Sequence, residues 1–292
     1  MTAVFGLVLS ISMGAARAAP EHAGQRAATV APGKFCAPGP SPSPETEVIA
    51  CTRLIEAGVD LSASYFRRGM AENRLRRFEA AIADYDRAIA IEPGNPDFFD
   101  ARGNAWNNLG DHARAVLDYD TTLRLNPRAA ETLDNRCWAK AAWLHDPNGA
   151  VRDCEAALRL RPGHGNTLEN IGFAYLQLGR LSDAVRSYSS ALAENPSRPD
   201  SLFGRGIAEE RLGRTDEARA DLANARRLNP RVDDEYRGYG IVAGIKARRP
   251  LVVPSRGDSA GPAFTPYSSS VVSVSSSGSG FMSRPLSAQG DR

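Results

Sequence analysis

The sequence lacks the charge pattern of a nucleic-acid-binding protein. Its 36 Lys and Arg residues are almost balanced by 34 Asp and Glu residues. It contains no long run of basic residues with interleaved aromatic side chains. Because binding to a polyphosphate backbone depends on concentrated positive charge, we expect no nucleic-acid partner.

Motifs for catalysis and metal binding are also missing. No Gly-rich phosphate loop precedes a Lys, no nucleophile elbow occurs, and Cys and His do not fall at zinc-site spacing. The four histidines are His22, His112, His145 and His164. None has a nucleophile beside it in the sequence, and histidines in turns are usually solvated. We therefore expect no catalytic residue, cofactor or metal, with a hydrolase of unrecognised site as the open alternative.

Long hydrophobic runs are scarce. The one at the start, Ala3–Met13, is shorter than the roughly 20 residues that span a bilayer. Small residues follow it at the spacing of a signal-peptidase site, which predicts a signal peptide of residues 1–18, cleaved after Ala18. No Lys or Arg precedes the run, which indicates a misassigned start codon or a poor signal. An uncleaved anchor is the alternative. We expect an exported chain whose mature form is not stably inserted in a membrane.

Two segments that flank the middle of the chain lack the composition of a packed domain. Residues 19–44 are rich in Pro, Ala and Gly, and residues 250–292 are rich in Ser. Neither composition supports regular hydrogen-bonded structure or offsets the entropy of ordering. We expect a leader without regular structure and a disordered tail.

The middle of the chain repeats every 34 or 35 residues. Prolines mark the step at Pro93, Pro127, Pro162, Pro196 and Pro230. Three further registers keep the same step: Gly69, Gly103, Gly172 and Gly206; Ala81, Ala115, Ala150, Ala184 and Ala218; Tyr85, Tyr119 and Tyr188. Self-similarity at this period indicates stacked structural units.

The pattern within each unit predicts a helical hairpin. In the fourth, Leu168–Leu178 and Leu181–Leu192 are amphipathic, with Gly179 between them and a proline after the second. Gly172 is small where the helices cross, so Tyr188 can fill the space beside it. Since each hairpin leaves an apolar face that only the next one covers, the hairpins form a one-dimensional stack.

This pattern resembles the tetratricopeptide repeat family. The residues that carry the resemblance in the fourth unit are Gly172, Tyr175, Gly179, Ala184, Tyr188, Ala191 and Pro196. Arg68 and Glu72 stand where the family usually has apolar residues. The resemblance implies an all-α, right-handed α-solenoid with disordered termini. After the leader, it gives an incomplete half-repeat (45–61), five repeats (62–95, 96–129, 130–164, 165–198 and 199–232), a capping helix (233–249) and the tail.

A closer likeness is to exported bacterial tetratricopeptide proteins. It rests on Asn135-Arg136-Cys137-Trp138 and on the later Asp153-Cys154. This likeness implies a location in the cell envelope, and we expect the protein in the periplasm.

The four cysteines fall into two pairs by repeat register. Cys51 and Cys154 occupy the position of the packing tyrosine, Cys137 occupies that of the small glycine, and Cys36 falls within one residue of it. Paired positions face each other across a helix crossing, so of three connectivities we predict Cys36–Cys51 and Cys137–Cys154. Free buried thiols are the alternative.

The family resemblance also implies a concave groove lined by the first helix of each hairpin. The expected groove residues are Phe66, Met70, Asp100, Asn104, Asn107, Asp134, Trp138, Glu169, Phe173, Leu176, Phe203 and Ile207. Such a floor suits a protein or peptide with apolar anchors and basic residues. The alternative is that the aromatic residues are ordinary packing or are covered by the tail.

These expectations favour a non-catalytic scaffold that binds a protein or peptide in the envelope. A regulatory or substrate-delivery subunit of an envelope enzyme complex is the alternative. Phe66 and Asp100 stand where family members that bind chaperone tails have basic residues, so we expect no binding of acidic EEVD-type tails.

Overall fold

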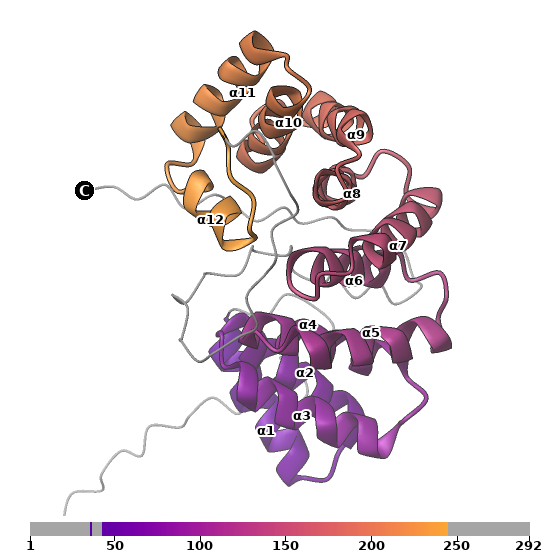
Figure 1. The fold of residues 1–292 in the computed structure, drawn as a ribbon. Coiled ribbons are helices and arrows are strands. Elements are labelled where there is room, and N and C mark those ends of the chain that lie inside the picture. The colour runs from indigo at the N-terminus through magenta and orange to yellow at the C-terminus, as the bar shows by residue number, and fades with distance from the viewer. Residues whose placement is uncertain (1–35, 37–42, 245–292) are drawn as a thin grey trace, which may run out of the picture.

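The computed structural model describes Cys36 and residues 43–244 (Figure 1). The segments predicted as a signal peptide, most of the leader and the tail lie outside the described residues. The described part folds into helices without a strand: α1 Pro44–Glu56, α2 Leu61–Arg74, α3 Phe78–Ile91, α4 Pro96–Leu109, α5 His112–Leu125, α6 Ala130–Ala142, α7 Pro147–Leu160, α8 Gly165–Gln177, α9 Leu181–Glu194, α10 Pro199–Arg211, α11 Thr215–Leu228 and α12 Val232–Gly238.

The helices pair into five hairpins, α2–α3 to α10–α11, that stack in chain order. The first helix of each hairpin also contacts the first helix of the next, whereas no two second helices are in contact. First helices therefore form the inner side of a curved stack and second helices the outer side (Figure 1). The expected all-α solenoid is confirmed.

Helix ends follow from local chemistry. Proline opens α1, α4, α7 and α10, where its missing N–H costs no helical hydrogen bond. The Asp111 and Asp146 side chains accept a hydrogen bond from the first turns of α5 and α7. Gly110 and Gly179, between the helices of their hairpins, have positive φ, which only glycine adopts at little cost.

Tyrosine packed on glycine holds each of three hairpins together. Tyr85, Tyr119 and Tyr188 are at most 1% exposed, and each faces the glycine 16 residues before it. A Cβ atom on that glycine would lie between 2.7 and 3.0 Å from the tyrosine ring. The close approach of the two helix axes, predicted from the repeat register, therefore depends on the missing side chain.

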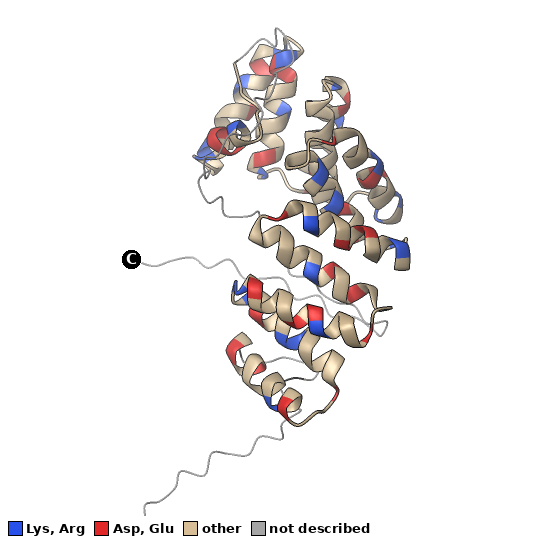
Figure 2. Cartoon of the chain, turned by 60° about the horizontal axis from the view of Figure 1, so that its bottom comes forward, with Lys and Arg blue, Asp and Glu red and all other residues tan. Residues whose placement is uncertain are grey.

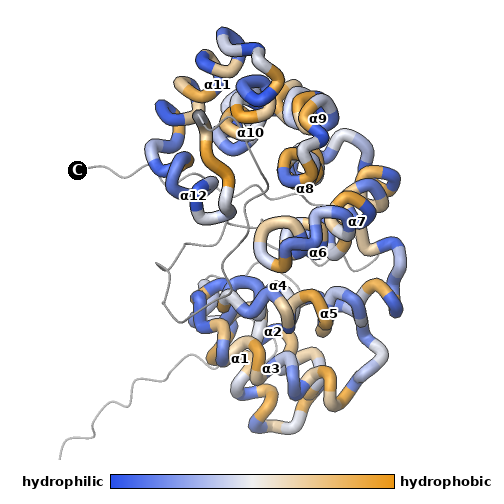
Figure 3. The backbone as a smooth tube through the Cα atoms, in the orientation of Figure 1, coloured by the Kyte–Doolittle hydropathy of each residue, from blue (hydrophilic) through white to orange (hydrophobic). Residues whose placement is uncertain are grey.

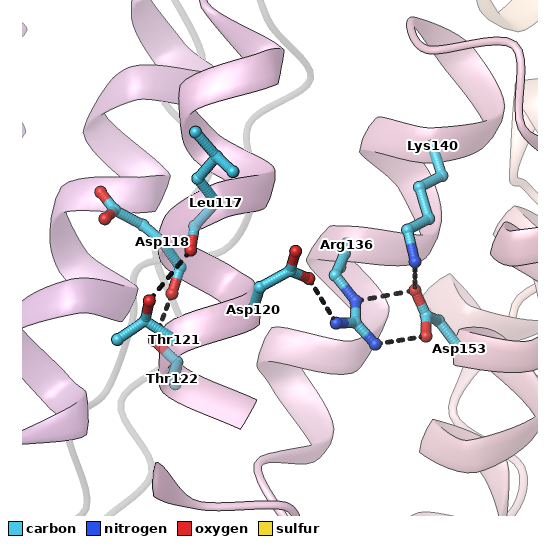
Figure 4. Close-up of polar contacts among 8 residues, drawn as sticks. All are labelled: Leu117, Asp118, Asp120, Thr121, Thr122, Arg136, Lys140 and Asp153. Atoms are coloured by element: carbon cyan, nitrogen blue, oxygen red, sulfur yellow. Dashed lines mark hydrogen bonds and ion pairs between the residues drawn. The ribbon is translucent and has the colours of Figure 1, made fainter. Parts of the chain in front are cut away.

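A periodic row of Arg–Asp ion pairs joins the helices of four hairpins. The pairs are Arg68–Asp84, Arg102–Asp118, Arg136–Asp153 and Arg205–Asp221, with N–O distances of 2.6 or 2.7 Å. Arg136 also reaches Asp120 of the preceding hairpin at 2.6 Å, and Lys140 reaches Asp153 at 2.8 Å (Figure 4). Arg68, irregular by the family pattern, is thus the first member of this row.

The fourth hairpin interrupts the row, because Ile171 and Ser187 occupy the two positions. Elsewhere, basic and acidic residues stand close together along the described helices (Figure 2). This arrangement agrees with the balanced composition.

Both predicted disulfide bonds are present in the structure. The Cα atoms are 5.0 Å apart in Cys36–Cys51 and 5.5 Å apart in Cys137–Cys154. Cys51, Cys137 and Cys154 have no exposed surface. In the third hairpin the covalent bond therefore takes the place of the Gly–Tyr contact. Among the described residues, none of the helices has the length and apolar character needed to cross a membrane.

Candidate functional site

The inner helices carry a row of carboxylates, each bonded to a residue of the following first helix. Thr132 of α6 donates to Asp100 of α4 at 2.6 Å, and Ser201 of α10 donates to Glu169 of α8. Between them, Asp134 of α6 accepts from the side-chain amide of Asn170 at 2.9 Å. The predicted acids of the groove floor therefore lie one repeat apart along the inner surface.

Two of these acids, Asp100 and Asp134, have raised pKa values and lack the ion pairs that the acids of the Arg–Asp row make. Burial raises the pKa of Asp100 to about 6, and burial raises the pKa of Asp134 as well. Neither carboxylate has an ion-pair partner among the residues that the structure describes. Burial leaves both carboxylates poorly solvated, and the charges of His164 and Arg161 oppose the rise in the pKa of Asp134.

Amide groups extend this polar surface. Asn104 donates to Asp100 at 3.1 Å, and its carbonyl oxygen accepts from the Tyr119 hydroxyl at 2.7 Å and from Asn135 at 2.9 Å. Asn107 lies one turn further along α4 and is half-buried. With half-buried Met70 of α2, these residues form what we call the polar half of the groove: Met70, Asp100, Asn104, Asn107 and Asp134.

Phe66 belongs to the core more than to this surface. It is 9% exposed, and its ring lies 4.8 Å from Phe98 and 5.8 Å from Tyr85. It joins the first two hairpins by packing.

The other part of the expected groove is closed. We call it the aromatic half, and its residues are Trp138, Phe173, Leu176, Phe203 and Ile207. Four of its residues are at most 2% exposed: Phe173, Leu176, Phe203 and Ile207. The chain's own C-terminal cap covers the two phenylalanines, with Tyr236 4.8 Å from Phe203 and Tyr239 5.3 Å from Phe173 between ring centroids. Trp138 stays half-buried, 5.6 Å from Tyr239.

The cap was expected from the sequence, but its shape was not. The sequence predicted a capping helix over residues 233–249, whereas α12 spans Val232–Gly238. Gly240 then takes a positive φ and turns the chain. The signal for this turn is visible in the sequence, because Gly240 continues the step of Gly172 and Gly206.

His112 differs from the expectation of a solvated turn residue. Its ring stacks on Trp143 with centroids 4.5 Å apart, and its Nδ1 lies 2.8 Å from the Asn107 side-chain oxygen. Burial lowers the pKa of His112 to about 4, so the ring is neutral at physiological pH. It contributes to packing between the second and third hairpins.

The acids beneath the cap predict a pH dependence of stability. Burial, then Glu169 of α8 and Glu235 of α12, raises the pKa of Asp200 to about 7, against an opposing effect of Arg198. Because the folded chain holds this proton to a higher pH than the unfolded chain, whose Asp pKa is about 4, the free energy of unfolding falls as pH rises from about 4 to about 7.

We therefore expect the melting temperature to be several degrees higher at pH 5 than at pH 8, measured by circular dichroism at constant ionic strength. In Asp200→Asn the slope should be smaller. An unchanged slope in the variant would show that other groups cause the dependence.

Comparisons with known proteins agree with this architecture. Two tetratricopeptide repeat family models match residues 62–95 and 170–232, together less than half of the chain. No curated protein sequence matches the chain.

Similar solved structures include MamA from Desulfovibrio magneticus RS-1, with 20% identity and a TM-score of 0.55 over 60% of this chain and 98% of that one. A further MamA crystal structure has 19% identity and a TM-score of 0.53 over 59% and 93%. YrrB, described as a TPR protein with an unusual peptide-binding site, has 16% identity and a TM-score of 0.55 over 66% and 100%. At these identities the likeness shows the tetratricopeptide-type solenoid fold.

Proposed function

We propose that this chain is a non-catalytic scaffold that binds a protein or peptide segment along the inner surface of its solenoid. The observation that carries the proposal is the pair of carboxylates without ion-pair partners, Asp100 and Asp134, in the described polar half of the groove. Several buried acids are instead paired with Arg, as Asp118 is with Arg102. Unpaired carboxylates therefore mark the inner surface as the place where a basic side chain of a partner gains most.

The neighbouring side chains add the other contacts that a peptide needs. Met70 and Trp138 offer apolar surface, and Asn104 and Asn107 offer amide groups for hydrogen bonds to a peptide backbone. The partner we propose is therefore an extended or helical segment with apolar anchors and at least one Lys or Arg. The description of YrrB as a peptide-binding protein of similar fold supports this reading.

We also propose that the protein works in the bacterial envelope, in the periplasm. Two disulfide bonds are typical of proteins that fold in an oxidising compartment. The signal-like segment of residues 1–18 and the Asn-Arg-Cys-Trp likeness support the same location. Detection of the protein in the periplasmic fraction, with residue 19 as its N-terminus, would test the location.

Charge removal at Asp100 tests the binding surface. Peptides selected from a random library on the full chain should be enriched in Lys or Arg beside an apolar residue. The Asp100→Asn variant should bind such a peptide at least about ten-fold more weakly, because one partner of a partly desolvated charge pair is lost. Isothermal titration calorimetry would measure the change.

Asp86→Asn is the matched control, since it removes the same charge from the outer helix α3, where Asp86 is exposed and pairs with Arg102. Its binding should stay within two-fold of the unaltered chain. An equal loss in both variants would show a general effect of net charge, and selected peptides without basic residues would contradict the proposed partner.

A further inference from the structure

The described C-terminal end consists of two parts that are held to the solenoid by different interactions. The first part, α12, begins one repeat after α10 and stacks on it as a sixth first helix would. Its Tyr236 is 3% exposed and donates to the Asp200 carbonyl at 2.8 Å, and Asp233 pairs with Arg226 at 2.7 Å. This part is an anchored cap.

The second part, Tyr239–Gly244, is what we call the strap. Glycines with positive φ stand at Gly240 and Gly244, and the apolar residues between them form the hydrophobic stretch that follows α12 in Figure 3. Its described hydrogen bond to the hairpins runs from the Gly244 N–H to the Glu210 carboxylate at 2.7 Å. The strap is therefore held mainly by side-chain packing.

Tyr239 makes the packing contacts of the strap with distant repeats. Its ring lies 5.6 Å from Trp138 of α6, 5.4 Å from Trp143 and 5.3 Å from Phe173 of α8, each in an edge-to-face arrangement. Edge-to-face pairs stabilise each contact beyond the area they bury. One half-buried tyrosine thus bridges the cap to the third and fourth hairpins.

We propose that the strap is an internal ligand of the aromatic half of the groove, and that a partner peptide displaces it by placing its own aromatic side chain on Trp138, Trp143 and Phe173. This inference rests on the proposed function. It specifies that one apolar anchor of the partner is an aromatic residue. The cap α12 stays in place during the exchange, because Tyr236 and Asp233 hold it independently.

The geometry explains why an aromatic residue is preferred. The rings of Trp138, Trp143 and Phe173 lie around the Tyr239 ring in edge-to-face contacts. An aliphatic side chain would lose these ring contacts, and a charged side chain would lose its hydration. The polar half of the groove, beginning at Asp134 one turn from Trp138, would take the basic residue of the same peptide.

The experiment uses the full chain and a synthetic peptide of residues 234–244 as the probe. The strap is tethered to the solenoid and competes with the probe at an effective concentration of about millimolar. Removing the Tyr239 ring should therefore strengthen binding of the probe. We expect the Tyr239→Ala variant to bind the probe at least about ten-fold more tightly than the unaltered chain. Trp fluorescence is the readout, because two of the three tryptophans contact Tyr239.

Two controls define the result. Tyr239→Phe keeps the ring and should bind the probe as weakly as the unaltered chain, and a probe with Ala in place of Tyr239 should not bind the Tyr239→Ala variant. Circular dichroism verifies that each variant is folded. Equal affinities of the folded Tyr239→Ala and Tyr239→Phe variants, or no binding to either, would overturn the proposal. That result would leave the Asp100-dependent binding of basic peptides untouched, so the two proposals fail separately.

Discussion

A Gly204→Leu variant is expected to lose at least about 3 kcal/mol of unfolding free energy, because Gly204 packs directly on the buried ring of Tyr188. A Cβ atom on Gly204 would lie 2.3 Å from the ring carbon Cζ of Tyr188. On its other side the same ring meets Gly172, where a Cβ would lie 3.0 Å away. The tyrosine is therefore enclosed between two glycines and cannot move aside, so a side chain at 204 must push α10 away from α9.

Urea unfolding followed by circular dichroism would measure this loss, with Gly94→Leu as the control. No atom lies within 4 Å of a Cβ added to Gly94, and its φ is not in the left-handed region. That variant should unfold within about 0.5 kcal/mol of the unaltered chain. In the background Tyr188→Ala, the Gly204→Leu substitution should cost much less, because the ring it meets is gone. Equal losses at positions 94 and 204 would contradict the packing argument.

The repeat register predicted those parts of the fold that depend on neighbours in one or two hairpins. Tyr188 and Gly172 were recognised as a packing pair from the 34-residue step, and Cys137 and Cys154 were paired by the same step. Such contacts depend on the local crossing of two helices, which the sequence determines directly. Helix breaks at Gly179 and before the prolines follow from backbone chemistry alone.

The closing of the aromatic half could not be predicted in the same way. Tyr239 meets Trp143 across nearly a hundred residues of sequence, and whether the two rings meet depends on the curvature that accumulates from the third hairpin to the fifth. A small change in each crossing angle would move the cap away from α6. The sequence indicated a cap and, as an alternative, that the tail covers the groove aromatics, but it did not identify Tyr236 and Tyr239 of the cap region as the residues that cover them.

The Arg–Asp row shows a different limit. Arg68 was noted as a departure from the family pattern, yet its spacing of 16 residues to Asp84 recurs in Arg102 and Asp118. The arginines recur on the first helices and the aspartates on the second helices. The ion pairs are therefore recognised only when these two registers are compared with each other. The groove residues Asp100 and Asp134 were found because the family resemblance supplied the inward-facing positions; their lack of an ion pair required the structure.

Removal of the Cys137–Cys154 bond is expected to lower the free energy of unfolding by about 3 kcal/mol. Both residues are fully buried at the crossing of α6 and α7, in the middle of the stack, so Ala at both positions removes the cross-link and leaves space in the core. Urea unfolding without reductant would measure the loss. Ala at Cys36 and Cys51 should cost less, because that bond joins Cys36 to α1 at the end of the described stack.

A Cys137→Gly, Cys154→Tyr variant tests why the bond is there. Three other hairpins close with Gly and Tyr at these positions, so this variant should recover at least half of the stability that the double-Ala variant loses. Recovery would mean that the bond and the Gly–Tyr contact are interchangeable ways to hold two helices at one distance. A variant less stable than double Ala would mean that the third crossing is narrower than the others and cannot admit a ring. Because Trp138 follows Cys137 in α6, the position of the groove's aromatic half would then depend on the oxidised state of this bond.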